Sequence, residues 1–170
     1  MGIIDRLEAA TRTANTLAAR ASGVLILAIV LALVQEVFSR YALGAPSTWI
    51  MDYSRFALLY AFFLALGPAL QSGHHVDVDL FDPLVPQKFR RAQRLAGDAL
   101  TLIFGAILMW QLFAMTEEVF ESDEMAFAMV PVELKYVYWI GPVGAFLFVL
   151  TAFVRLARRW QGEPEPASPS

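Results

Sequence analysis

The chain has 170 residues, of which 58% are hydrophobic and 17% are charged, and its formal net charge is −3. A soluble domain carries about a quarter charged residues. The apolar residues here gather in long runs, which indicates a membrane protein. The sequence contains no cysteine, which excludes disulfides, thiolate metal sites and dithiol redox chemistry.

Residues 1–21 are predicted to form an N-terminal amphipathic helix that leads into the membrane. Its apolar residues recur at helical spacing: Ile3, Ile4, Leu7, Ala10, Ala14, Leu17 and Ala21. Such a segment can lie in the membrane interface or can simply extend the first span, and the sequence leaves both readings open. No small-residue cleavage site follows the first apolar run, so we do not expect a signal peptide.

Four membrane spans are expected within a membrane domain of residues 22–157, because each apolar run approaches the ~20 residues that a helix needs to cross a bilayer. The spans cover about residues 22–40, 49–71, 95–116 and 136–157. The predicted fold is therefore an all-α integral membrane protein, a four-transmembrane-helix bundle. The Pro- and Ser-rich residues 158–170 are expected to be a disordered cytoplasmic tail.

The distribution of Lys and Arg predicts the orientation of the spans. Most of these residues fall before the first span, between spans two and three, or at the end of span four: Arg6, Arg12, Arg20, Lys88, Arg90, Arg91, Arg94, Arg155, Arg158 and Arg159. The opposite side holds only Arg40 and Lys135. Both termini are therefore expected in the cytoplasm.

Four charged residues are expected at one depth near the periplasmic side: Glu36, Arg40, Asp52 and Arg55. The connection between spans one and two is short, so the spans are antiparallel neighbours, and the pairs have i,i+4 and i,i+3 spacing. We interpret these residues as a structural charge network, since a balanced network lets a bundle tolerate charge at that depth. The alternative is a proton or ion relay through Glu36 and Asp52.

Two Gly-Pro pairs and one histidine pair lie in or beside the predicted spans. Gly67-Pro68 and Gly141-Pro142 are expected to bend spans two and four, because proline removes a backbone donor. His74 and His75 are adjacent, so they cannot ligate one haem from facing helices, and their spacing to nearby Asp residues fits no metal site. We expect no metal, no cofactor, no catalytic residue and no nucleic-acid partner.

The loop between spans three and four is acidic and carries an apolar stretch, Met125 to Pro131. Such a loop suits a partner surface outside the membrane. It can equally be a solvated loop whose apolar part lies against the bilayer.

Five sequence features, in this order, resemble a known family. They are Phe38-Ser39-Arg40-Tyr41 with Gly44 and Ser47; Trp49 to Arg55; Phe63-Leu64; Gly73-His74-His75-Val76-Asp77-Val78-Asp79; and Met125 to Pro131 with Tyr136 and Pro142-x-Gly144. The chain resembles the small membrane subunit, the Q-type small permease, of TRAP (tripartite ATP-independent periplasmic) transporters. The family-motif positions are Trp49, Gly73, His75, Asp79, Pro131, Pro142 and Gly144. Met51 stands where the family usually has a first acidic residue, and Ala65 stands where a glycine is common.

The resemblance implies a division of labour between three proteins. A periplasmic substrate-binding protein captures an organic acid, and a large permease subunit moves it inward with sodium. The small subunit, in the bacterial inner membrane, packs against the large subunit and helps to receive the binding protein. The competing hypothesis is a small autonomous proton-coupled transporter that uses Glu36.

Overall fold

The computed structural model describes residues 2–47, 49–72, 87–122, 125 and 132–161. The elements in chain order are α1 (Ile3–Ala42), α2 (Ile50–Gln71), α3 (Gln87–Ser122), α4 (Lys135–Tyr138) and α5 (Ile140–Trp160). Within the described part of the chain, four helical stretches are long and apolar enough to cross a membrane: Ile4–Ala42, Ile50–Gln71, Ala92–Ser122 and Lys135–Trp160. The predicted all-α bundle with four spans is confirmed.

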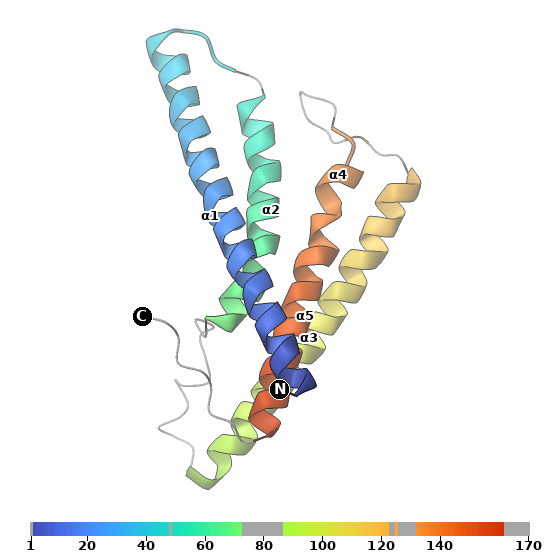
Figure 1. Cartoon of the computed structure of the whole chain (residues 1–170). Coiled ribbons are helices and arrows are strands. Elements are labelled where there is room, and N and C mark those ends of the chain that lie inside the picture. The colour runs from blue at the N-terminus through green and yellow to red at the C-terminus, as the bar shows by residue number, and fades with distance from the viewer. Residues whose placement is uncertain (1, 48, 73–86, 123–124, 126–131, 162–170) are drawn as a thin grey trace.

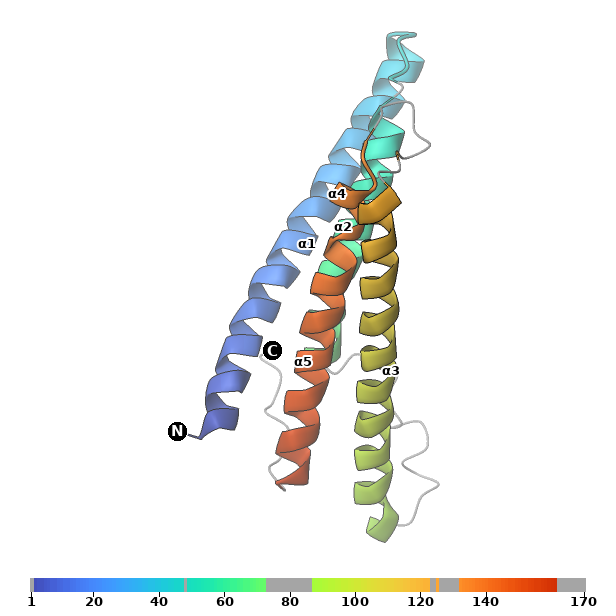
Figure 2. The same cartoon turned by 90° about the vertical axis from the view of Figure 1, so that its right-hand side faces the viewer.

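The two ends of the bundle gather different parts of the chain (Figures 1 and 2). One end holds the start of α1, the start of α3 and the end of α5, and we call it the Asp98 end. The other holds the end of α1, the start of α2, the end of α3 and α4, and we call it the Glu36 end. The outer parts of α1 and α2 diverge from α3 and α5 toward the Glu36 end (Figure 1).

Helix α1 is one uninterrupted helix of 40 residues, about 60 Å long at 1.5 Å per residue. Residues 3–21 therefore continue directly into the first span in this structure. The buried side chains from residue 4 to residue 22 are small or polar: Thr11, Asn15, Ala18 and Ser22. Leu17, on another face, is exposed. The lead-in thus packs on the bundle through a polar stripe.

Helix α5 is the centre of the bundle. It packs against α1, α2 and α3, and Figure 1 shows it between α2 and α3. Half of the most apolar 18-residue segment of Lys135–Trp160 is buried. In the most apolar 18-residue segment of Ala92–Ser122, on α3, only 6% is buried. A small apolar cluster of Leu70, Phe148 and Ala152 joins α2 to α5.

Small residues allow the close contact between α2 and α5. A Cβ added to Gly144 would lie 2.4 Å from the Phe63 carbonyl oxygen, and one added to Gly67 would lie 2.9 Å from Leu147 Cγ. Membrane helices associate through such small residues because lipid tails supply no hydrophobic drive between helices. Gly144, a predicted motif position, therefore sits where two backbones meet.

Many large apolar side chains point outward from the bundle. On α1 and α3, Val24, Leu31, Ile107 and Trp110 are each more than half exposed. A soluble protein rarely exposes a continuous apolar surface of this extent. The arrangement is that of a bundle whose surroundings are apolar.

The two prolines occupy different positions. Pro68 lies inside α2, which continues to Gln71. Pro142 lies in the first turn of α5, where a backbone donor has no helical acceptor in any case. The break in the fourth span falls at Trp139, between α4 and α5. Helix α5 includes Arg158 and Arg159, so the first residues of the expected tail are helical.

We predict that Gly144→Ala lowers the free energy of unfolding by about 1–3 kcal/mol, because the new methyl group forces α5 away from the backbone of α2. Gly23→Ala is the matched control, since nothing lies within 4 Å of a Cβ at that α1 position. Thermal unfolding of both variants in detergent, followed by circular dichroism, measures the difference. Equal melting temperatures for both variants would contradict the close contact.

Candidate functional site

Glu36 lies on α1 near its end, with only 4% of its side chain exposed. Its Oε1 pairs with Arg40 Nη2 at 2.8 Å. Its Oε2 accepts hydrogen bonds from the backbone N–H of Ser47, at 3.1 Å, and from the Ser47 hydroxyl. Because Ser47 belongs to the connection before α2, this carboxylate fixes the turn between α1 and α2. Three donors on one buried carboxylate satisfy it well.

Asp52 and Arg55 lie in the first turns of α2. Asp52 is buried, and its Oδ1 pairs with Arg55 Nη2 at 2.8 Å. The Arg55 side chain is 71% exposed, whereas that of Asp52 is 9% exposed. Trp49 precedes the helix as its N-cap residue and stacks edge-to-face on Tyr53 with ring centroids 5.9 Å apart. The acid thus points into the bundle and the base points away from it.

The structure places both predicted pairs at the Glu36 end. Each pair closes within its own helix, α1 or α2, and Ser47 is the described link from Glu36 to the next segment. The joining of both pairs into one network stays a prediction. Glu36 is bonded to a base and to Ser47, a setting that suits a structural carboxylate better than a relay.

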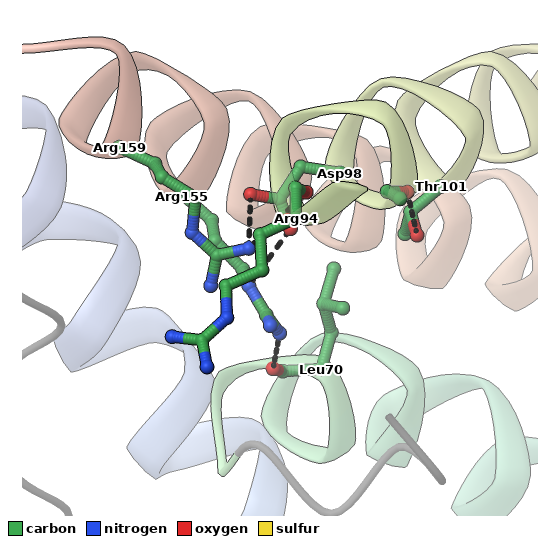
Figure 3. A network of polar contacts seen from close by, with 7 residues as sticks. Leu70, Arg94, Asp98, Thr101, Arg155 and Arg159 are labelled. Carbon is green, nitrogen blue, oxygen red and sulfur yellow. Dashed lines mark hydrogen bonds and ion pairs between the residues drawn. The ribbon is translucent and has the colours of Figure 1, made fainter. Parts of the chain in front are cut away.

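The Asp98 end holds a second ion-pair cluster (Figure 3). Asp98 of α3 is buried, and it pairs with two residues of α5: Arg155 through Nε at 3.1 Å and Arg159 through Nη1 at 2.8 Å. Arg159 Nη1 also donates to the backbone carbonyl of Arg94 at 3.2 Å. One acid on α3 therefore receives two bases from the last turns of α5.

Arg155 and the neighbouring Arg158 of α5 reach the other two long helices. Arg155 Nη1 donates to the Leu70 carbonyl at the end of α2, at 3.4 Å (Figure 3). Arg158 Nη2 pairs with Asp5 at 2.7 Å and also with Glu8, both near the start of α1. The last turns of α5 thus hold α1, α2 and α3 together at this end.

This cluster was missed by the sequence analysis, which used these arginines only to orient the spans. A signal was present: Arg155, Arg158 and Arg159 have i,i+3 and i,i+4 spacing, which gathers them on one side of a helix end, and Asp98 lies at the expected depth in span three. The sequence does not show that these arginines pair with Asp98, because that depends on how α3 packs on α5.

A buried polar contact joins three helices between the two ends. Asn15 Nδ2 of α1 donates to Gln71 Oε1 of α2 at 2.6 Å and to Thr151 Oγ1 of α5 at 3.0 Å. Ser22 of α1 donates to the Ala61 carbonyl of α2 at 2.8 Å. Polar side chains commonly bridge membrane helices in this way. These bonds explain why the buried stripe of α1 is polar.

Of the remaining family-motif positions, two lie in α5 and four lie outside the described residues. Pro142 and Gly144 lie in the first two turns of α5, and Gly144 contacts Phe63 of α2. Gly73, His75, Asp79 and Pro131 lie outside the described residues. In the described ranges, no group of three His, Asp or Glu side chains is placed to hold a metal ion.

The α2–α4 contact near the Glu36 end is aromatic. Trp139 Nε1 donates to the Tyr60 hydroxyl at 2.7 Å, and that hydroxyl donates to the Tyr136 carbonyl. Tyr and Trp are enriched where a span meets the membrane interface. The fold and these polar ends together define a multi-pass α-helical membrane protein whose polar groups hold helices to one another.

Comparison with protein-family models identifies the family. Residues 29–162 match the model of the DctQ component of tripartite ATP-independent periplasmic transporters. The match covers most of the chain, so this chain belongs to that family, and it is a TRAP transporter small membrane subunit of the inner membrane. The resemblance stated from the motifs is confirmed. A comparison with curated proteins found no match.

We predict that Glu36→Ala lowers the free energy of unfolding by about 1–3 kcal/mol, because the Ser47 N–H and the Arg40 guanidinium lose their acceptor. The control is Thr13→Ala, which removes an exposed hydroxyl bonded only within its own helix. Chemical denaturation in detergent gives the free energy of unfolding of both variants. An unchanged midpoint for Glu36→Ala would show that the turn does not depend on this carboxylate.

Asp98→Ala should destabilise the chain more, by about 3–5 kcal/mol, because two largely buried arginines lose a shared acid. Glu117→Ala, at an exposed α3 position, should change little. Melting temperatures and protease sensitivity of both variants test this. A melting temperature of Asp98→Ala equal to that of Glu117→Ala would refute the clasping role of Asp98.

Proposed function

We propose that this subunit packs against the large permease subunit of its transporter and steadies it in the membrane. In this proposal the Asp98 end and both termini lie in the cytoplasm, and the Glu36 end faces the periplasm. On the ground of the family resemblance, we also propose that the transporter takes up an organic acid together with sodium. The substrate itself is handled by the other two components.

One observation carries the proposal. The buried acids Glu36, Asp52 and Asp98 are each ion-paired within the chain and lie at its two ends. A transport site lies near the middle of the bilayer and is typically built from broken helices. Charges already neutralised within one chain near its ends hold helices together and are poorly placed to bind a transported anion. A supporting subunit therefore fits better than an autonomous carrier using Glu36.

The last turns of α3 support a role in receiving the binding protein. Glu117, Glu118 and Glu121 are exposed there, beside the exposed Phe120. Charged surfaces of this kind steer the encounter with a soluble partner and select its orientation. We propose that this surface meets a basic patch on the periplasmic binding protein.

The test is co-expression of this chain with the large permease and the binding protein of the same transporter. We expect the large permease to co-purify with this chain, and uptake to require all three proteins. Asp52→Ala and Arg55→Ala should each reduce uptake, since each breaks the ion pair at the start of α2. Thr13→Ala serves again as the exposed control. Unchanged uptake and co-purification in both α2 variants would overturn this role of the pair.

A further inference from the structure

We propose that one exposed stripe of α2, formed by Met51, Arg55, Leu58 and Phe62, is the surface that binds the large membrane subunit. In this contact the Arg55 guanidinium meets a carboxylate of that subunit. The inference rests on the proposed function and deepens it, because it names the face of the chain that the partner covers.

The four residues form one continuous face. Their spacing of four, three and four residues places them in line along a helix. Met51, Leu58 and Phe62 are each more than half exposed. Other faces of α2 are covered by this chain, since Ala61 accepts a hydrogen bond from α1 and Gly67 contacts α1 and α5. The stripe is therefore the side of α2 that the bundle leaves open.

Arg55 gives this face its distinctive chemistry. Among the residues that the structure describes, Asp52 is its one partner, through a single Nη2–Oδ1 contact at 2.8 Å. A guanidinium has five N–H donors, and the Arg55 side chain is 71% exposed. Ionisable side chains within membrane spans almost always face a bundle interior. Arg55 faces away from its own bundle, so a second membrane protein that covers this face of α2 would meet its guanidinium.

The middle turns of α1 and α3 present exposed apolar side chains without a charge, whereas Arg40, at the end of α1, is 49% exposed and pairs with Glu36. The run from Val24 to Val34 on α1 and the run from Leu100 to Phe113 on α3 contain no charged residue. Exposed members of these runs, such as Leu27 and Ile107, suit lipid tails. The middle turns of α1 and α3 therefore suit lipid, whereas the α2 stripe combines an arginine with apolar side chains.

The occupant is identified by complementarity. An exposed arginine is best matched by a carboxylate, which can accept two parallel N–H bonds. Leu58 and Phe62, which follow Arg55 along the stripe, match an apolar helix surface. A partner with both features is a membrane protein, and the tripartite family supplies a further membrane component for this role.

The absence of cysteine makes the surface testable by single-cysteine labelling in the intact complex. We would attach benzophenone maleimide to Leu58→Cys and Phe62→Cys on α2, and to the matched controls Leu27→Cys on α1 and Ile107→Cys on α3. After illumination in membranes, both α2 positions should give a several-fold higher yield of adduct with the large subunit than either control. Adding Arg55→Gln should lower the yield from Phe62→Cys several-fold, because the charge contact is lost.

The outcomes separate this inference from the proposed function. If the unmodified chain does not co-purify with the large subunit, the proposed function itself fails. If it co-purifies but the adducts form chiefly from Leu27→Cys or Ile107→Cys, the α2 surface is wrong and the proposed function stands. Phospholipid adducts alone from both α2 positions, in the assembled complex, would also overturn the inference.

Discussion

The pairing of Asp98 with two arginines of α5 is the interaction on which the arrangement of the helices most depends. A carboxylate at this depth is costly unless it is neutralised. The bases that neutralise it are placed so that Arg155 also reaches the end of α2, while the adjacent Arg158 reaches the start of α1. The central position of α5 fits these contacts, because its arginines reach all three neighbouring helices in the part of the chain that the structure describes.

Between the ends, contact is made by small and polar residues. Gly67 and Gly144 let backbones approach, and Asn15 bridges three helices through hydrogen bonds. Large apolar residues would separate the helices, and they gain nothing from leaving a lipid environment. The chain therefore exposes many of its bulky residues, and beside the small cluster around Phe148 it places small and polar residues between the helices.

The sequence predicted the parts of this structure that depend on composition and local spacing. The four spans follow from apolar run length, and the pairs at Glu36 and Asp52 follow from i,i+4 and i,i+3 spacing within one helix. Arg155 and Arg159, which pair with Asp98, and the residues bonded to Asn15 lie on other helices, so these contacts depend on which faces meet. The continuity of α1 was one of two readings that the sequence left open, because a lead-in helix and a span have the same local geometry.

The two ion pairs at the Glu36 end have unequal consequences although their distances are equal. Glu36 is bonded on both oxygens within the chain, so that pair is complete and fixes a turn. Asp52 is buried, whereas Arg55 is largely exposed. The positively charged half of this pair therefore lies on an apolar outer surface of α2. A helix packing partner can use such a charge for specificity, because an apolar surface alone does not set the register of two helices in lipid. The asymmetry of the second pair is thus more informative about assembly than the completeness of the first.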